Sequence, residues 1–206
     1  MQTELTVRWG QGFTAAMDGL RRDGWFAGQV GASTDEFDAV SYHLVVAIAG
    51  APVGLVRTTL GPPSVLQAWS GGRSLLPRGA TVAELTRGVV APSVRRLGIY
   101  RLAMLESILR LPALGATVAT GAVELDFVGR RFLAGLGFVE VGAPILFDDR
   151  PRRGTIAQCL TLPLDAWREA SWNAMRRTLI QQLTECGYRV DSDLESSWIE
   201  AHTAPA

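Results

Sequence analysis

The clearest candidate for chemistry is the stretch of residues 83–102, AELTRGVVAPSVRRLGIYRL. Its apolar residues predict a β-strand that ends at Val89 and Val90, and Pro92 and Gly98 indicate a turn that leads into a helix. The first N–H groups of a helix have no partner within it and carry the positive end of its dipole, so they readily bind phosphate. We therefore expect a phosphate site at this helix start.

Two arginines and a glycine at this point favour a pyrophosphate group. Arg95 and Arg96 offer guanidinium donors, and Gly98 lets a ligand approach the backbone closely. Upstream, on the predicted strand, lies the carboxylate of Glu84. The pattern predicts a phosphate site with an acid about one strand length away.

A second set of charged residues precedes this stretch. Arg57 lies on a predicted strand, on the same apolar face as Val53 and Leu55. A buried arginine needs an anionic partner, because an unpaired buried charge is costly. Asp35 or Asp38 in the preceding loop could be that partner, and so could a carboxyl or carbonyl group of a substrate.

Composition limits the classes of function. The chain has 206 residues, enough for one main domain, and 48% of them are hydrophobic, which predicts a substantial core. The formal net charge is +0, so broad nucleic-acid binding is disfavoured. All 20 basic residues are arginine.

Cysteine and histidine usage excludes other kinds of site. Cys159 and Cys186 do not form a disulfide framework, and with His43 and His202 they have no metal-ligand spacing, so we expect no metal site. His43 is expected to be a structural residue of its strand. The sequence shows no signal segment and no apolar run long enough to span a membrane, which predicts a cytoplasmic protein.

The rest of the chain alternates strands and helices, and residues 61–79 are expected to form a long irregular connection. The expected strands are residues 3–9, 41–49, 53–59, 116–123, 138–141 and 156–162, and the expected helices are residues 11–22, 100–110, 126–136 and 164–186. We expect a main domain over residues 1–163. Residues 164–206 are expected to form a helical appendage that packs on it or mediates a dimer contact.

Two blocks resemble the GNAT acyltransferase superfamily. The first, VVAPSVRRLGIY, is similar to its acyl-CoA-binding strand, loop and helix start, although Tyr100 stands where Gly or Ala is usual. The second, RRFLAGLGFVEVG, is similar to its later helix and strand, although Leu133 replaces a tyrosine that often acts as general acid. The resemblance implies an α/β fold with a mixed, largely antiparallel central sheet flanked by helices. It also implies that the following residues contact the donor: Val89, Val90, Arg95, Arg96, Gly98, Ile99 and Tyr100.

The chain also resembles the acyl-homoserine-lactone synthases and N-acyl amino acid synthases, which share that fold. The likeness consists of an arginine with aromatic residues, a D-x-x-D pair, an arginine on the next strand and an E-x-x-R sequence, in that order. The resemblance implies that the substrate-binding residues are Arg21, Trp25, Phe26, Asp35, Asp38, Arg57 and Arg87, with Glu84 as the catalytic residue.

The implied reaction is transfer of an acyl group from a thioester to an amine. The amine must be neutral to attack, and we expect Glu84 to be the base, acting through a water if the amine is distant. No nucleophilic triad is evident, so direct attack without a covalent enzyme intermediate is favoured. In a regular strand Glu84 and Arg87 would point to opposite faces, and we expect a β-bulge near Gly88 to bring them to one side.

The expected function is thus N-acyl transfer to a small-molecule amine, with an acyl-carrier protein or coenzyme A thioester as co-substrate and no permanently bound cofactor. An acetyl-CoA-dependent N-acetyltransferase and a non-catalytic acyl-CoA-binding protein are the alternatives. A homodimer is a further expectation. Two interpretations stay open for Arg130, Arg131, Arg150, Arg152 and Arg153: a basic patch that binds an acidic acyl-carrier protein, or solvated charges of a turn.

Overall fold

The computed structural model describes residues 2–24, 34–61, 79–147 and 155–194. Its strands are β1 (Thr3–Gln11), β2 (Tyr42–Ile48), β3 (Ala51–Leu60), β4 (Val82–Val90), β5 (Val118–Glu124), β6 (Val139–Phe147), β7 (Thr155–Pro163) and β8 (Tyr188–Ser192). Its α-helices are α1 (Ala15–Gly24), α3 (Ile99–Arg110), α4 (Arg130–Leu136) and α5 (Ala166–Glu185), and the short 3-10 helices are η1 (Pro92–Val94) and η2 (Pro112–Leu114).

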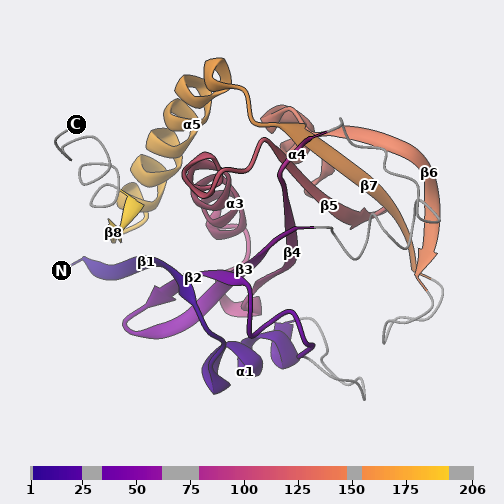
Figure 1. The fold of residues 1–206 in the computed structure, drawn as a ribbon. Helices are drawn as coiled ribbons and strands as arrows, with labels where there is room; N and C mark the ends of the chain where they lie inside the picture. Colours follow the sequence, from indigo (N-terminus) through magenta and orange to yellow (C-terminus); the bar gives the residue numbers. More distant parts are fainter. Residues whose placement is uncertain (1, 25–33, 62–78, 148–154, 195–206) are drawn as a thin grey trace, which may run out of the picture.

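All of these strands belong to one sheet, in the order β6-β7-β5-β4-β3-β2-β1-β8. The pairs β4–β5 and β1–β8 are parallel, and the other neighbours are antiparallel. The expected mixed, largely antiparallel sheet is therefore confirmed (Figure 1).

The hairpin of β2 and β3 closes through Ala49 and Gly50, one residue earlier than the turn predicted from the sequence. Both residues have positive φ, 48° and 82°, as a two-residue turn between right-handed strands requires. The pairing of β2 with β3 shifts in register between Val46 and Ala47, and Val53 packs in the core cluster under α3. It therefore does not lie with Leu55 and Arg57, as the simple alternation had predicted.

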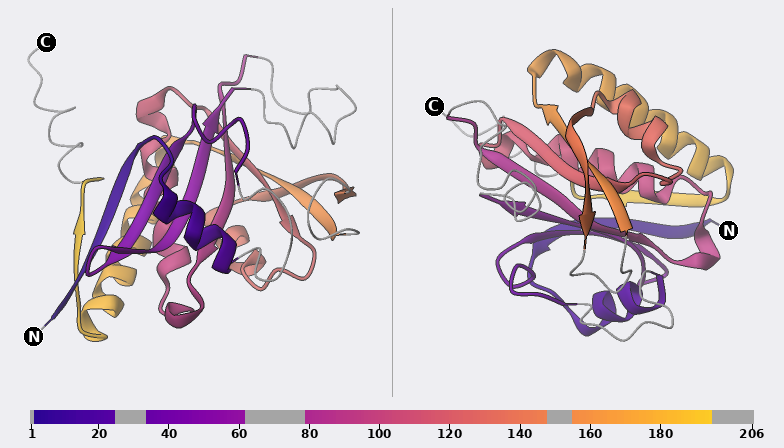
Figure 2. Two further views of the ribbon diagram at one scale, coloured as in Figure 1. Left: turned by 90° about the horizontal axis from the view of Figure 1, so that it is seen from below. Right: turned by 90° about the vertical axis from the view of Figure 1, so that its right-hand side faces the viewer.

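Helices cover both faces of the sheet. Helix α1 packs on β3 and β4 from one side, and α3 packs on β2, β3 and β4 from the other, with α5 outside it (Figure 2). The faces are accordingly called the α1 face and the α3 face. Leu20, Leu55 and Val89 form a small core on the α1 face, while the main core lies on the α3 face.

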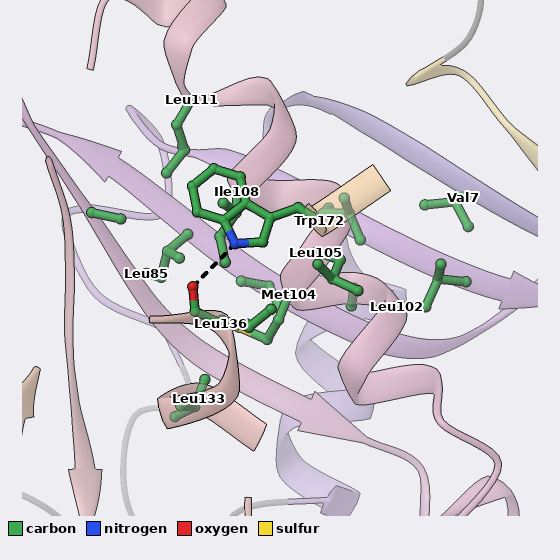
Figure 3. Packing of buried hydrophobic residues seen from close by; sticks show 14 of the residues in the cluster. Val7, Leu85, Leu102, Met104, Leu105, Ile108, Leu111, Leu133, Leu136 and Trp172 are labelled. Atoms are coloured by element: carbon green, nitrogen blue, oxygen red, sulfur yellow. Dashed lines mark hydrogen bonds between the residues drawn. The ribbon is translucent and has the colours of Figure 1, made fainter. Parts of the chain in front are cut away.

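The main core joins α3, α4 and α5. Leu102, Leu105 and Ile108 of α3 are fully buried there, and Trp172 of α5 packs beside them (Figure 3). The Trp172 indole N–H donates a hydrogen bond of 3.0 Å to the carbonyl of Leu136, which satisfies its polar atom inside the core. Helix α5 thus shares the hydrophobic core of the preceding residues.

The C-terminal part differs from the expected all-helical appendage. After α5 the chain forms β8, which pairs in parallel with β1 from Thr3 opposite Tyr188 to Val7 opposite Ser192. Without β8, the edge of β1 would leave backbone N–H and C=O groups unpaired, and β8 satisfies them. The hydrophobic periodicity of the sequence did not predict this strand. The predicted domain boundary after residue 163 stays a prediction.

Strands β4 and β5 diverge soon after they start. Their pairing runs from Val82 opposite Val118 to Glu84 opposite Thr120 and goes no further. Figure 1 shows β5 turning away with β6 and β7 while β4 stays with β3. Among the described strands, none pairs with the later residues of β4 on that side, and the candidate site lies at this divergence.

Candidate active site

A β-bulge in β4 organises the site. Leu55 pairs with Val89 and Arg57 pairs with Thr86, so β4 holds one extra residue opposite Val56. Arg87 within the bulge has a φ of 55°, a left-handed conformation that an arginine adopts only when its surroundings impose it. The bulge expected near Gly88 is confirmed.

The bulge brings the acid and the arginine of β4 to the α1 face. Glu84 lies directly opposite Thr59, and Thr86 lies opposite Arg57, so these side chains share a face. Arg87 would point away in a regular strand, yet its guanidinium reaches Asp35, which also binds Arg57. Glu84 is 1% exposed.

Five charged side chains form one network on this face, defined here as the α1-face network: Arg21, Asp35, Asp38, Arg57 and Arg87. Asp38 accepts a hydrogen bond of 2.8 Å from Arg21 and one of 3.1 Å from Arg57. Asp35 binds Arg57 through one carboxylate oxygen and Arg87, at 2.8 Å, through the other. The sequence left open whether Asp35 or Asp38 is the partner of Arg57, and in the structure both bind it.

Backbone and aromatic groups fix this network in place. The amide of Asp35 donates to the Asp38 carboxylate at 3.1 Å, which closes the D-x-x-D sequence into a turn. The guanidinium of Arg21 lies 4.3 Å from the ring centroid of Phe13, and the side chain is fully buried. The Nε of Arg57 donates to the Thr86 hydroxyl at 3.1 Å.

The arginines keep both aspartates ionised. Burial opposes ionisation of Asp35, but the charge and hydrogen bond of Arg57, with those of Arg87, outweigh it and lower its pKa below the ordinary value. Burial likewise opposes ionisation of Asp38, and the hydrogen bond and charge of Arg21 lower its pKa overall. Among these five side chains the three arginines exceed the two aspartates by one positive charge.

His43 supports the network from β2. It is 1% exposed, lies opposite Arg57 in the sheet, and its Nε2–H donates to the carbonyl of Asp38 at 3.0 Å. Burial lowers the pKa of His43, so the ring is neutral near pH 7. Its expected structural role agrees with this position.

The start of α3 lies beyond the far end of β4. Gly98 caps the helix with a φ of 84°, and Ile99 at its first position is buried against the core. Within the described residues, the backbone N–H groups of residues 96–101 have no acceptor. A helix start with several unpaired donors is suited to bind an anion.

The two arginines of this loop are exposed. Arg95 donates to the carbonyl of Gly24 at the end of α1, at 3.3 Å, and Arg96 has a φ of 71°. Their predicted contact with pyrophosphate stays a prediction. So do the roles of Val89 and Val90, which lie at the end of β4.

Tyr100 packs against the bulge from the α3 face. A Cβ atom at Gly88 would lie 2.9 Å from Cε2 of Tyr100, so only glycine leaves room for the ring. The ring also contacts Phe127 edge-to-face, with centroids 5.5 Å apart. Burial raises the pKa of Tyr100 well above its ordinary value, so the phenol stays protonated.

Several predicted residues lie elsewhere. Trp25 and Phe26, expected at the acceptor side, fall outside the described residues, as does most of the 61–79 connection. In the candidate basic patch, Arg130 binds Glu140 and the Leu125 carbonyl, and Arg131 is exposed. Arg150, Arg152 and Arg153 are also outside the described residues.

Sequence reasoning missed His43 and Thr86 as parts of the site. Thr86 follows Glu84 by two positions, which places both on one face, and this spacing was an available signal. His43 was expected to be a structural residue of its strand. Its hydrogen bond to the Asp38 carbonyl depends on the conformation of the loop that holds Asp38, which the sequence does not predict. Cys159, which lies near Glu84, is inert: burial, with the negative charge of Glu84, raises its pKa to about 12.

No model of a known family matches the sequence, and no curated protein does. Solved structures do match. The N-acyl amino acid synthase FeeM from uncultured soil microbes has a TM-score of 0.61 at 14% identity, over 85% of this chain and 98% of that one. The CoA-dependent acyl-homoserine-lactone synthase BjaI has a TM-score of 0.61 at 14% identity, over 92% of this chain and 93% of its own.

A third match widens the comparison. The ribosomal-protein-S18-alanine N-acetyltransferase from Escherichia coli has a TM-score of 0.55 at 14% identity, over 77% of this chain and 94% of that one. Acetyltransferases and acyl synthases thus share this arrangement of strands and helices. The chain has the GNAT fold. In this GNAT-fold chain the diverging strands, the β4 bulge and the α3 start lie together.

Over residues 2–24, 34–61, 79–147 and 155–194, no group of three or more His, Cys, Asp or Glu side chains is arranged to hold a metal ion. None of the helices in these ranges combines the length and apolar character needed to cross a membrane.

Proposed function

We propose that this protein is an N-acyltransferase that moves an acyl group from a pantetheine thioester to the amine of a small metabolite. The observation that carries the proposal is the β4 bulge, which places Glu84 and the α1-face network on one face of the sheet. The unpaired N–H groups of residues 96–101 lie just past the other end of β4. A phosphate-bearing donor and a charged acceptor therefore have separate sites that meet at one strand.

The donor is proposed to bind by its phosphates at the start of α3. Its thioester then lies along β4 beyond Glu84, the last residue that pairs with β5, where no described strand pairs with β4 on that side. The carbonyl of a thioester accepts hydrogen bonds, and backbone N–H groups that face it stabilise the charge that develops on its oxygen. This agrees with a coenzyme A thioester, and with a carrier-protein thioester that presents the same pantetheine arm.

Glu84 is proposed to remove the proton from the acceptor amine, directly or through a water. The neutral nitrogen attacks the carbonyl carbon and the C–N bond forms. The C–S bond then breaks, the thiolate leaves with the bonding electron pair, and the proton that the nitrogen loses as the amide forms passes through solvent to the thiolate. A covalent enzyme intermediate is not favoured, because the Cys159 thiol with its raised pKa stays protonated near neutral pH.

The acceptor is proposed to carry a carboxylate. Arginines bind carboxylates through paired hydrogen bonds, and the Arg87 side chain of the α1-face network is still 16% exposed beside Asp35. Amino acids and S-adenosylmethionine have both an amine and a carboxylate. The same D-x-x-D and E-x-x-R residues support an acyl-homoserine-lactone or N-acyl amino acid synthase as the narrower proposal. A plain acetyltransferase is the alternative.

Product detection tests this proposal. Purified protein is incubated with acetyl-CoA or a long-chain acyl-CoA and a panel of amines, and mass spectrometry searches for acylated products and free thiol. Glu84→Gln is expected to lower turnover by about 10²–10⁴-fold, the usual contribution of a positioned base, and to leave thioester binding unchanged.

Glu140→Gln is the matched control, because Glu140 is exposed and distant from β4 in the sheet order. Full activity of Glu84→Gln would overturn the role of Glu84. Absence of any acylated product, despite thioester binding by the wild type, would instead favour a protein that only binds acyl-CoA.

A further inference from the structure

The ring of Tyr100 spans the divergence of β4 and β5 on the α3 face. It rests against Gly88 of β4 on one side and against Phe127, just after β5, on the other. Both contacts lie beyond Glu84 and Thr120, the last pair that the two strands form. On the α3 face, the ring therefore bridges the two strands just past the point where they part.

Gly88 and Tyr100 are matched in shape. A Cβ atom at Gly88 would lie 2.9 Å from Cε2, 3.8 Å from Cδ2 and 3.9 Å from Cζ, so one edge of the ring, centred on Cε2, lies over the bulge. Phe127 holds the ring by an edge-to-face contact, and both rings pack on the main core. Among the described residues no hydrogen bond of the Tyr100 hydroxyl is found, and the ring contacts Gly88 and Phe127 through its carbon atoms.

We propose that Tyr100 limits the length and bulk of the acyl group that the enzyme transfers. This inference rests on the proposed function, in which the donor's phosphates bind the N–H groups of residues 96–101 and its thioester reaches the bulge. Tyr100 lies between these two points, in the first turn of α3. Its ring blocks the passage between β4 and β5 toward the core on the α3 face, so a long acyl chain cannot extend into that core.

The test compares acyl donors of different length. The ratio of kcat/KM for decanoyl-CoA to that for acetyl-CoA is measured in the wild type, Tyr100→Ala and Tyr100→Phe, and the two affinities are measured by calorimetry. Tyr100→Ala is expected to raise the ratio by about tenfold or more, since a few methylene groups in an apolar pocket change selectivity on that order. Tyr100→Phe keeps the bulk and is expected to keep the wild-type ratio.

Two further variants separate a local effect from a general one. Phe132→Ala removes an aromatic ring that also packs on the core, under the guanidinium of Arg101 rather than against the bulge. It is expected to lower stability without changing the ratio. Tyr100→Leu removes less volume, so it reports the same shift if the alanine variant does not fold.

The outcomes distinguish the two proposals. An unchanged ratio in folded Tyr100→Ala or Tyr100→Leu, with normal wild-type turnover, overturns the inference alone, and so does a shift in Tyr100→Phe as large as that in Tyr100→Ala. If the wild type binds thioesters without turnover, the ratio of the affinities for decanoyl-CoA and acetyl-CoA replaces the ratio of kcat/KM. A higher ratio in Tyr100→Ala then supports the inference, and an unchanged ratio overturns it. A wild type that binds neither thioester overturns the proposed function and this inference together.

Discussion

Asp38 is the residue on which the α1-face network depends most. It is 4% exposed and binds two arginines, Arg21 and Arg57, that are themselves buried. Removing its charge breaks the ion pair with Arg21 and one of the two ion pairs of Arg57, in a poorly solvated place. Asp35 is less buried and binds Arg57 and Arg87 at the edge of the network.

Asp38→Asn is expected to lower the free energy of unfolding by about 3–5 kcal/mol, the usual cost of breaking a buried ion pair from one side. Urea denaturation measures the change. Asp191→Asn is the control, because Asp191 pairs with Arg8 at the surface and such pairs contribute about 0–1 kcal/mol. Equal stability losses in the two variants would contradict the role of Asp38.

Secondary-structure elements are joined by a second ionic cluster on the α3 face. Glu106 of α3 is fully buried and accepts hydrogen bonds from Arg110 at 2.6 Å, from Arg176 of α5 at 2.5 Å and from Ser192 of β8 at 3.0 Å. Arg110 also binds Asp193, whose other oxygen accepts from the amide of Trp9 in β1 at 2.8 Å. One cluster thus holds α3, α5, β1 and the C-terminal strand.

Glu106→Ala is therefore expected to lower the free energy of unfolding by about 3–5 kcal/mol, because Arg110 and Arg176 each lose a buried ion pair. Hydrogen exchange is expected to become faster in residues 188–192, since Ser192 also loses its partner.

The control for this cluster is Glu185→Ala, at the exposed end of α5, where the carboxylate bonds only to Gln181 among the described residues. It is expected to change stability by less than about 0.5 kcal/mol. Wild-type exchange rates in β8 of Glu106→Ala would show that β8 is held by its pairing with β1 alone.

Across the whole molecule, the sheet separates two regions that the proposed reaction must join. The acceptor side, with the α1-face network, lies under α1, and the donor side begins at α3 on the opposite face (Figure 2). Strand β4 contributes to both regions, because its bulge turns Arg87 toward the α1 face, while Tyr100 packs against Gly88 from the α3 face. Stability of the fold and geometry of the site therefore depend on the same strand.

The pH dependence of unfolding reports the state of this buried face. Burial lowers the pKa of His43, so near and below about pH 6.5 the unfolded chain binds a proton that the folded chain does not. Stability is then expected to be constant above about pH 7 and to fall toward lower pH, by at most about 1.4 kcal/mol per pH unit for one group. The lowered pKa values of Asp35 and Asp38 predict a second fall below about pH 4.

Urea denaturation between pH 8 and pH 3 measures this profile. His43→Gln is expected to remove the fall that begins near pH 6.5 and to keep the fall below about pH 4. An identical profile in both proteins would assign the first fall to another group.

The sequence by itself determined where local strands and helices form and which charged side chain, Arg57, requires a partner of opposite charge. Alternation along β1 placed Leu5 and Val7 inside, and the R-x-x-G loop marked the start of α3. Burial of Arg57 required an anion, and spacing alone showed that Glu84 and Arg87 could share a face only through a bulge. These conclusions depend on neighbours in the chain, which is why one sequence sufficed for them.

Only the tertiary structure decided which distant residues meet. It joined Arg87 to Asp35, placed Tyr100 against Gly88, and closed the sheet with β8 beside β1. It also revealed the cluster around Glu106; the position of this carboxylate among the buried apolar residues of α3 was a sequence signal that the prediction did not use. Ion pairs, strand register and ring contacts of this kind depend on the approach of segments far apart in sequence, and periodicity carries no information about that approach.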